Sequence, residues 1–514
     1  MLKQCIAKWH WYIAVGLFFI ALSIYTFKLG EISSGFHGDE AELALFSSKI
    51  IRGEVKSFIG VGVHNHPIIS LLPQALSFSI FGENIFSARL PSAIFSAASI
   101  PIFYFFLLHL FNARVALFSS ILFLASHLWI AMSRFGPINT QVVFFELLVF
   151  YFLFLALKTK RIVFFVLLAL GCSMMFYLYV GFRVIPIIVV IILLKEIIFR
   201  EEKRRIIRAV LISSIFFLFA SLPQINFFLH HPNAFNDRTN SIFIFGNSAE
   251  AKEWREYNDK GKTYGEILLE QTKKTFMLSS PRDTSGQYGY PNLVLDPITT
   301  LFVSIGILIT ITNILKTKYL LLLLWFFLTL LMGNILMINP FFLPRATVAI
   351  PAVYIFAGLA LNKLFYYIKR FPHKTTWVLY FITYCFIAGI IVSNIKIYFI
   401  DSEKEMFGDT AKYTATKIAN YIKMHEPIYT IVFLTSPGLH AHFAPIRFLA
   451  PNANIVNIDN PKEYLPKTVS KTIFIVYPYY KNKLEELMAI NPHGILTTEH
   501  DKKERIQYFI YKIN

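Results

Sequence analysis

Residues 11–42 read WYIAVGLFFIALSIYTFKLGEISSGFHGDEAE, an apolar segment long enough to cross a bilayer followed at once by an acidic cluster. Charged side chains so close to hydrocarbon are costly unless they line a wet cavity or carry out a task. The adjacent carboxylates of Asp39 and Glu40, with His37 and Glu42 beside them, are therefore candidates for a functional site.

The same cluster also fits an ordinary helix start. Gly38 and Asp39 would cap a helix from Glu40 to about Arg52, and helix N-termini favour carboxylates in any protein. The two interpretations are compatible, since Asp39 can begin a helix and still project its carboxylate into a cavity.

The composition indicates a polytopic membrane protein. Of 514 residues, 55% are hydrophobic and 17% aromatic, while only 16% are charged, which no ordinary soluble domain of this length shows. The net charge of +18 does not indicate a nucleic-acid partner, because Lys and Arg occur in short clusters between apolar segments, as in cytoplasmic loops. Cys5, Cys172 and Cys385 are far apart in or beside apolar segments, so we expect buried thiols.

Eleven apolar runs are long enough to cross about 30 Å of hydrocarbon. They lie near 11–29, 87–110, 113–132, 138–157, 162–180, 184–200, 207–228, 297–315, 319–338, 346–367 and 376–398. The first is too long for a signal peptide and lacks a small-residue cleavage site, so we expect a retained signal anchor. If the spans alternate, the basic clusters all fall on the side of the N-terminus, as the positive-inside rule requires. The clusters are Lys158–Arg161, Lys195–Arg208, Lys316 with Lys318, and Lys363–Lys374.

The opposite, external side then receives the loops 30–86 and 229–296 and everything after about residue 400. In the first loop, the apolar run Pro67–Phe81 is short and both its flanks are external, so we expect a helix lying in the membrane interface. His64 and His66 precede it at i and i+2 spacing with no third ligand evident. A zinc site is therefore a weaker interpretation than imidazoles that contact the interface or a substrate.

The chain divides into a membrane domain, residues 1–400, and a water-soluble external domain, residues 401–514. In the second domain, Asp409 and Thr410 can cap an amphipathic helix that runs to about Met424. The remaining runs are strand-like at Tyr429–Leu434, Thr472–Tyr477 and Arg505–Tyr511 and helical at Lys483–Ala489. This pattern predicts a small α/β domain, and without a nucleotide-phosphate loop it is not expected to bind a nucleotide sugar.

Four isolated arginines lie at the external ends of the spans, where positive charge is normally avoided: Arg89, Arg134, Arg183 and Arg345. Each alone fits an interfacial arginine that extends to lipid headgroups. Several that converge near an acidic pair would suit a phosphate or pyrophosphate, whose oxygens match the planar guanidinium. Within the spans, Glu146 is a candidate for a site or for a polar strut between packed helices.

Several short motifs resemble the protein O-mannosyltransferase-like family, membrane-embedded glycosyltransferases of the GT-C class that comprise family 39 and its lipid A aminoarabinose transferase relatives. The motifs are Gly38–Ala41, His66–Pro67, Ala88–Ala93, Ser133–Gly136, Tyr177–Pro186, His231–Pro232 with Phe235 and Arg238, Leu295–Pro297, Pro344–Arg345 and Ala349–Ala352. The resemblance covers about residues 10–370. Each motif is short, but their order and spacing are hard to obtain by chance.

The resemblance implies a GT-C fold and an inverting transfer of a sugar from a polyprenyl-phosphate carrier to an acceptor hydroxyl on the external face of a cell membrane. The family's catalytic carboxylate corresponds to Asp39, and a positioned carboxylate can accept the proton of the attacking hydroxyl. Glu40 would support it, and we expect Glu42 to be a solvated helix residue. Protein, lipid and glycan acceptors all fit.

The leaving group is a lipid phosphate, which needs charge stabilisation more than a proton. Arg89 and Arg345 match motif arginines of the family and would bind this phosphate, with Arg134 and Arg183 as further candidates. The resemblance implies no metal and no cofactor. The histidines expected to contact substrate are His37, His64 and His66.

The sequence departs from the family's pattern at one place, and two other functions also fit it. Relatives often carry an acidic residue just after the Arg134 motif, where this chain has Ile138-Asn139-Thr140, so a contribution of Asn139 or Glu146 is undecided. A transporter or flippase of a lipid-linked glycan would also have many spans, but transporters usually place ionisable groups at mid-membrane in paired repeats. An envelope polymerase or ligase that takes a lipid-linked oligosaccharide would share the fold and differ in donor size.

Overall fold

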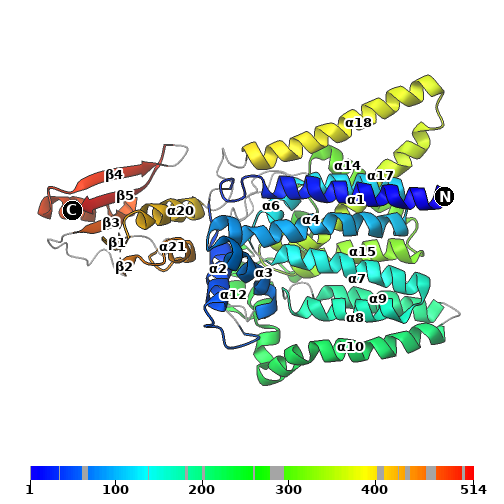
Figure 1. Ribbon diagram of the computed structural model, residues 1–514, viewed down its shortest axis with the longest axis horizontal. Coiled ribbons are helices and arrows are strands. Elements are labelled where there is room, and N and C mark those ends of the chain that lie inside the picture. Colours follow the sequence, from blue (N-terminus) through cyan, green and yellow to red (C-terminus); the bar gives the residue numbers. More distant parts are fainter. Residues whose placement is uncertain are drawn as a thin grey trace.

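The computed structural model describes the chain apart from residues 1, 34, 61–66, 137, 180–182, 200–202, 259–260, 278–293, 402–409, 427, 435–439, 459–470 and 501–503 (Figure 1). It consists of a bundle of long helices with a small α/β domain at one end. The polytopic helical fold and the C-terminal α/β domain predicted from the sequence are confirmed.

Helical segments lie at all eleven positions predicted from hydropathy. They are α1 (Leu2–Thr26), α4 (Ile85–Leu110), α5 (Ala113–Ala125) with α6 (His127–Ser133), α7 (Asn139–Thr159), α8 (Ile162–Phe176), α9 (Val184–Phe199), α10 (Lys203–His230), α14 (Pro297–Ile311), α15 (Thr317–Leu330), α17 (Ile350–Ile368) and α18 (His373–Lys396).

Within the described residues, seven of these segments are long and apolar enough to span a bilayer, and the pair α5 and α6 makes an eighth if it is taken as one span. The helices α8, α9 and α14 have 15 or 16 residues and fall below that length. The sequence therefore located the helices correctly. Judged by the length and composition of the observed helices, fewer than the eleven predicted runs are complete spans.

The run predicted near 113–132 is broken, because α5 and α6 meet at Ser126 with a bend of 62°. The Ser126 hydroxyl accepts a hydrogen bond from the Trp129 backbone N–H (3.4 Å), which caps α6. The Tyr354 hydroxyl, on α17, donates to the Ser126 oxygen (2.6 Å). A neighbouring helix therefore holds the bend in place.

Glycine allows the central helices to approach closely. A Cβ on Gly306 of α14 would lie 2.0 Å from the carbonyl oxygen of Phe356 on α17. A Cβ on Gly358 of α17 would lie 2.0 Å from the Ser119 hydroxyl on α5. Lipid tails are as apolar as the side chains, so membrane helices associate through close van der Waals packing and not through the hydrophobic effect. Small residues at helix crossings allow this close packing.

The facing ends of α7 and α8, of α9 and α10, of α14 and α15, and of α17 and α18 lie at the bundle end that holds the N-terminus (Figure 1). The basic clusters lie at these helix ends, so their described residues share one side of the bundle, as predicted. At the other end lie α2 (Gly38–Ile51), α3 (Ile68–Phe81) and the C-terminal domain. The run predicted at Pro67–Phe81 forms the helix α3, and its location in the membrane interface stays a prediction.

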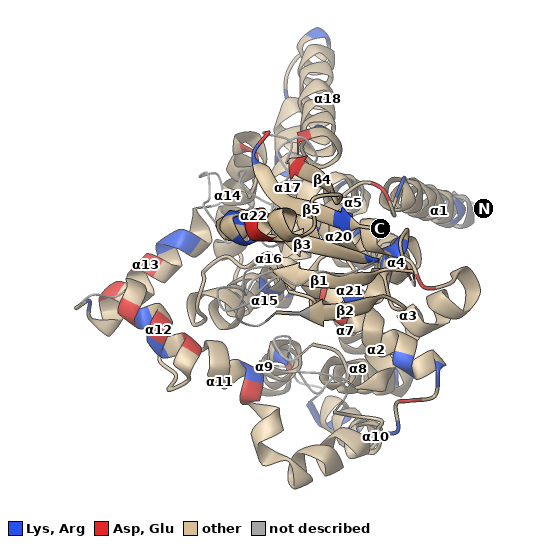
Figure 2. Ribbon diagram, turned by 90° about the vertical axis from the view of Figure 1, so that its left-hand side faces the viewer, with Lys and Arg blue, Asp and Glu red and all other residues tan. Residues whose placement is uncertain are grey.

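The segments 231–258 and 261–277 form short helices at the same end as α2. They are a 3-10 turn at Pro232–Phe235, α11 (Asp237–Ile242), α12 (Ala249–Asn258) and α13 (Tyr264–Phe276). Figure 2, which looks along the bundle from the C-terminal domain, shows α11, α12 and α13 at the margin, away from the sheet. Phe243 pairs with Met337 in an isolated β-bridge, which connects the first of these segments to the chain just after the π-helical turn Leu331–Ile335 that follows α15.

The described residues of the C-terminal domain form a five-stranded sheet in the order β2-β1-β3-β5-β4. The strands are β1 (Thr430–Leu434), β2 (Asn454–Asn457), β3 (Thr472–Val476), β4 (Ile495–His500) and β5 (Ile506–Ile513), with helices α20 (Thr410–Lys423), α21 (Ala444–Leu449) and α22 (Lys481–Ile490). The strands β1, β2 and β3 are parallel, while β4 and β5 are antiparallel to their neighbours.

The three strand-like runs and both helical runs predicted in this domain are confirmed. The strands β2 and β4 and the helix α21 were not predicted, since β2 has four residues, α21 has six, and β4 exposes most of its side chains. Asp409, predicted to cap α20, lies outside the described residues.

The C-terminal domain packs on the bundle through a shared apolar core. Phe36, Phe78 and Ala41 from the N-terminal part cluster with Ile418 of α20 and Phe448 of α21. The ring of Phe448 lies 5.4 Å from that of Phe36 and 5.6 Å from that of Phe78, between centroids. The soluble domain thus rests directly on the segment that carries the acidic cluster.

Candidate active site

The helix α2 begins with a capping box centred on His37. The His37 Nδ1 accepts a hydrogen bond from the Asp39 backbone N–H (3.1 Å), and the Glu40 carboxylate accepts one from the His37 N–H (3.0 Å). The helix predicted after Gly38 is confirmed, but its N-cap is His37 rather than Gly38 or Asp39. An unprotonated imidazole nitrogen here does what a Ser or Thr oxygen does in the usual capping box.

Glu40 forms a buried ion pair with Arg89 of α4. The Nε of Arg89 donates to Oε1 of Glu40 (2.8 Å), and a terminal nitrogen donates to Oε2 (3.0 Å). The backbone N–H of Gly136 also donates to Oε1 (2.8 Å). Both residues are 1% exposed. The Glu40 carboxylate therefore accepts four hydrogen bonds, including the one from His37, and is held in one position.

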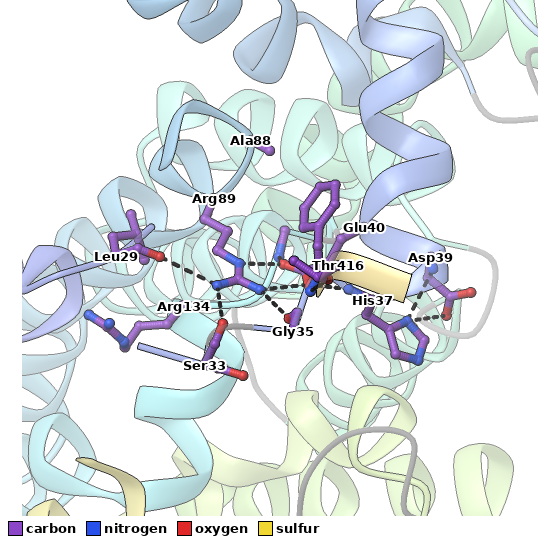
Figure 3. A network of polar contacts seen from close by, with 12 residues as sticks. Leu29, Ser33, Gly35, His37, Asp39, Glu40, Ala88, Arg89, Arg134 and Thr416 are labelled. Carbon is purple, nitrogen blue, oxygen red and sulfur yellow. Dashed lines mark hydrogen bonds and ion pairs between the residues drawn. The ribbon is translucent and has the colours of Figure 1, made fainter. Parts of the chain in front are cut away.

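The rest of the Arg89 guanidinium binds the backbone just before α2. It donates to the carbonyl oxygens of Ser33 (2.9 Å), Gly35 (2.9 Å) and, more weakly, Leu29 (3.4 Å). Figure 3 shows Arg89 between these carbonyls and Glu40. All five N–H directions of this guanidinium are thus used inside the protein.

Arg134 binds the C-terminal end of α1 in a similar way. Its terminal nitrogens donate to the carbonyls of Tyr25 (2.9 Å) and Lys28 (3.2 Å), and at longer range to those of Ile24 and Ile32. Its Nε donates to the hydroxyl of Tyr398, beyond the end of α18 (3.3 Å). A cation at a helix C-terminus is favourable, because it satisfies carbonyls and opposes the helix dipole.

The two buried arginines together bind backbone carbonyls between Ile24 and Ser33 and that of Gly35, in the segment that leads into α2. Figure 3 shows Arg134 near Arg89 and Ser33, while His37 and Asp39 lie beyond Gly35. The isolated positive charges noted in the sequence at these two positions therefore have partners within the protein, one carboxylate and a series of carbonyl oxygens.

Asp39 differs from its neighbour in exposure. Its side chain is 58% exposed, and its Oδ2 lies 4.0 Å from the His37 Nδ1, whose ring is buried. Glu42, one turn further along α2, is only partly exposed and lies within electrostatic range of Asp39 and of Arg447 on α21. The expectation that Glu42 is a solvated helix residue is thus only partly met.

Arg345 and Arg183 lie on other elements at the same end of the bundle. Arg345 is 6% exposed, donates to the Ile338 carbonyl (2.9 Å) and stacks on the ring of Phe342 (4.5 Å from its centroid). Arg183 donates to the Phe235 carbonyl (2.5 Å) and lies 4.2 Å from the centre of that ring.

Asn139 is connected to the Arg345 segment, and Glu146 is not. The side-chain amide of Asn139 donates to the carbonyl of Pro344, next to Arg345 (2.8 Å). Glu146, two turns further along α7, is fully buried, and among the described residues no donor forms a hydrogen bond with its carboxyl oxygens. The nearby Trp325 indole donates instead to the Val348 carbonyl (2.7 Å).

Several contributors to this region could not be identified from the sequence. The Gly136 N–H belongs to a motif whose recognisable feature in the sequence is Arg134, and Tyr398 lies at the end of an otherwise plain apolar run. Gln74 of α3 donates to the Ala88 carbonyl (2.8 Å) and accepts from the Ser47 hydroxyl (2.8 Å), which links α2, α3 and α4. The polarity of Gln74 inside an apolar helix was the one available signal.

Two predicted site residues, His64 and His66, lie outside the described residues. Within the part of the chain that the structure describes, no three His, Cys, Asp or Glu side chains gather in a way that would hold a metal ion. The expectation of a metal-free site stays a prediction.

Comparison with known proteins agrees with this architecture. Residues 65–223 match the sequence profile of the family described as dolichyl-phosphate-mannose-protein mannosyltransferase. No curated protein matches the sequence.

Solved structures of two glycosyltransferases are among those similar to nearly the whole of this chain. ArnT from Cupriavidus metallidurans, solved with undecaprenyl phosphate, has a TM-score of 0.51 at 12% identity, over 99% of this chain and 98% of that one. The Archaeoglobus fulgidus oligosaccharyltransferase in its apo form has a TM-score of 0.53 at 11% identity, over 97% and 74%. The chain therefore has the fold of the GT-C glycosyltransferases, and over residues 65–223 its sequence matches the dolichyl-phosphate-mannose-protein mannosyltransferase family.

Proposed function

We propose that this protein is an inverting glycosyltransferase that moves a sugar from a polyprenyl-phosphate carrier to an acceptor hydroxyl, with Asp39 as the general base. The observation that carries the proposal is the contrast between Asp39 and Glu40. The Glu40 carboxylate is buried and accepts four hydrogen bonds, whereas that of Asp39 is 58% exposed at the start of the same helix. A base must be reachable by the substrate and able to take up a proton.

Glu40 and Arg89 then have a positioning role. Arg89 connects the Glu40 carboxylate to the carbonyls of Ser33 and Gly35, so the backbone on both sides of His37 is held rigidly. A catalytic group that is misplaced by about 1 Å can lose about 100-fold in rate. The pair thus accounts for why an ionised carboxylate stands directly beside the proposed base without acting as a base itself.

The phosphate of the donor needs cations, and the planar guanidinium group matches phosphate oxygens well. We propose Arg345 and Arg183 for this task, since both lie at the same end of the bundle as Asp39 and their hydrogen bonds to the Ile338 and Phe235 carbonyls hold them there. Arg89 and Arg134 are proposed to hold the loop that presents Asp39. The resemblance to ArnT, which was solved with undecaprenyl phosphate, supports a lipid-phosphate ligand.

The proposed location is a cell membrane, with the active site and the C-terminal domain on the external face. The basic clusters lie at the opposite end of the bundle, as the positive-inside rule requires for an external site. A protein, lipid or glycan hydroxyl can serve as acceptor. A contact of His37, His64 or His66 with substrate also remains a proposal, in which the imidazole of His37 orients Asp39.

The test is sugar transfer by the purified protein in lipid nanodiscs, with a panel of polyprenyl-phosphate hexoses and pentoses and hydroxyl acceptors. With the donor and acceptor that the wild-type protein uses, Asp39→Asn should lower kcat by about 100- to 10,000-fold, the usual contribution of a general base. Glu31→Gln, an exposed acid of the same loop, is the matched control and should leave kcat unchanged. Wild-type activity in Asp39→Asn would remove Asp39 as the base, and lipid movement without transfer would indicate a flippase.

A further inference from the structure

The C-terminal domain makes a direct polar contact with the segment that presents Asp39. The backbone N–H of Phe36 donates to the hydroxyl oxygen of Thr416 on α20 (2.8 Å), across 380 positions of sequence. Phe36 is completely buried and Thr416 is 5% exposed. Phe36 lies three residues before Asp39, so this contact fixes the backbone close to the proposed base.

The Thr416 hydroxyl is well suited to hold this N–H. It donates its own proton to the carbonyl of Lys412 one turn earlier in α20 (2.7 Å). Its lone pairs therefore face away from the helix and accept the Phe36 N–H. A buried backbone N–H without a partner costs about 1–3 kcal/mol, so removal of this acceptor would displace the Phe36 peptide or leave it unsatisfied.

The surrounding contacts leave little room for the two segments to slide. A Cβ on Gly35 would lie 2.7 Å from Cγ of Lys412 and 3.1 Å from the ring of Tyr413. A Cβ on Gly38 would lie 3.2 Å from the ring of Phe443, just before α21. Two glycines of the acidic segment therefore let the soluble domain approach the backbone on both sides of His37.

The opposite face of the same segment is held by the membrane domain. Arg89 binds the carbonyls of Ser33 and Gly35, and the Phe36 N–H, on the next residue, points to Thr416. The peptide between Gly35 and Phe36 is thus bound through its oxygen by the bundle and through its nitrogen by the soluble domain. Loss of either partner would leave this peptide free to rotate.

We propose that the soluble domain is part of the active site and that Thr416 is a positioning residue for Asp39. This inference rests on the proposed function, since it assigns Thr416 a role in placing the proposed base. The domain holds one side of the catalytic segment and Arg89 holds the other. A small displacement of Asp39 then reduces kcat more than it reduces the stability of the fold, because rate depends on placement at the scale of about 1 Å.

Three variants of α20 test the proposal in the transfer assay described above. Thr416→Val keeps the shape and removes the acceptor, while Thr416→Ser retains a hydroxyl. Thr414→Val is the matched control, since the Thr414 hydroxyl donates to Gln507 inside the soluble domain (2.6 Å). We expect Thr416→Val to lower kcat by about 10- to 100-fold with KM for the donor nearly unchanged, as for a misplaced catalytic group. Thr416→Ser should restore most of the rate, and Thr414→Val should retain wild-type kcat.

Two outcomes would overturn the inference. One is wild-type kcat in Thr416→Val, and the other is an equal loss in Thr416→Val and Thr414→Val, which would indicate general weakening of the domain. The Asp39→Asn variant separates the two proposals, because wild-type activity there contradicts the proposed function, while an inactive Asp39→Asn with a fully active Thr416→Val contradicts only this inference.

A measurement on the wild-type protein covers the case in which Thr416→Val does not fold. Hydrogen exchange of the Phe36 amide reports the contact directly, because an N–H bonded to a buried hydroxyl exchanges only when the interface opens. We expect this amide to be protected to the same degree as the core amides of α20. Exchange as fast as that of an exposed amide would show that the soluble domain does not hold this segment.

Discussion

Glu40 and Arg89 lie 49 positions apart in the sequence and form two parallel hydrogen bonds, of 2.8 and 3.0 Å, in a fully buried environment. Such a pair costs much desolvation energy, so its net contribution to stability is small even when the geometry is good. Removal of one partner is different, because the other charge is then buried without compensation. The pair therefore fixes the geometry of the loop more than it stabilises the fold.

Replacing Arg89 should be strongly destabilising. Arg89→Ala leaves the Glu40 carboxylate buried without its cation and frees the carbonyls of Ser33 and Gly35, so we expect a loss of about 3–5 kcal/mol in the free energy of unfolding. Arg89→Lys should rescue little, because an ammonium cannot reproduce the two-pronged geometry. Unfolding of the two variants in mixed micelles measures both losses in the free energy of unfolding.

The control for this prediction is an exposed pair of the same kind. Arg52 and Glu83 are 3.1 Å apart with side chains 52% and 29% exposed. Arg52→Ala should therefore cost at most about 1 kcal/mol. Similar losses for Arg52→Ala and Arg89→Ala would contradict the assignment of a special role to the buried pair.

Arg345→Ala should weaken binding of undecaprenyl phosphate. A hydrogen bond to a charged group contributes about 1.5–3 kcal/mol, which corresponds to about 10- to 100-fold in Kd. Since Arg345 is 6% exposed, added salt should reduce this difference only slightly. Calorimetric titration measures the affinity. Arg370→Ala, just beyond the C-terminal end of α17, is the control. Equal affinities of the Arg345 variant and wild type would exclude Arg345 from the phosphate site.

Glu42 should make stability depend on pH. Burial, and then the nearby charge of Asp39, raise the pKa of the Glu42 carboxyl, and Arg447 opposes this shift. A carboxyl whose pKa is raised in the folded state contributes stability below its unfolded pKa, and that contribution is lost as pH rises through the folded pKa. Glu42→Gln should thus be more stable than wild type at neutral pH, and the difference should disappear in acid.

Arg447→Gln should have the opposite effect at neutral pH, because the cation that lowers the Glu42 pKa is removed. Arg447 is exposed, so the loss should be about 0.2–1 kcal/mol. Melting curves of both variants between acid and neutral pH check the prediction. No pH dependence of the difference between Glu42→Gln and wild type would show that this carboxyl is not perturbed.

Gly306 should tolerate no side chain. In Gly306→Ala the new Cβ would meet a backbone oxygen of α17 at 2.0 Å, so α14 must shift, at a cost of about 1–3 kcal/mol. Gly389→Ala in α18 has no neighbour within 4 Å and should be neutral or stabilising by about 0.5–1 kcal/mol. Equal unfolding free energies of the two variants would contradict the close packing of α14 on α17.

The sequence located the helices of the bundle because hydropathy is a local property, and each long apolar run must satisfy its backbone hydrogen bonds within itself in lipid. It also located α2, α20 and three strands of the soluble domain. It missed the bend at Ser126, which depends on Tyr354 of another helix, and it assigned the cap of α2 to Gly38 or Asp39 instead of His37.

The sequence by itself determined that a pair of carboxylates stands at the end of a membrane helix, and that isolated arginines share that side. Only the tertiary structure decided how these charges divide. Glu40 is buried against Arg89, Arg134 donates hydrogen bonds to carbonyls at the C-terminal end of α1, and Asp39 is exposed. The physical reason is that a buried polar group must find its partners wherever packing places them, here up to 380 positions away at Thr416. Local sequence patterns carry no information about such distant partners.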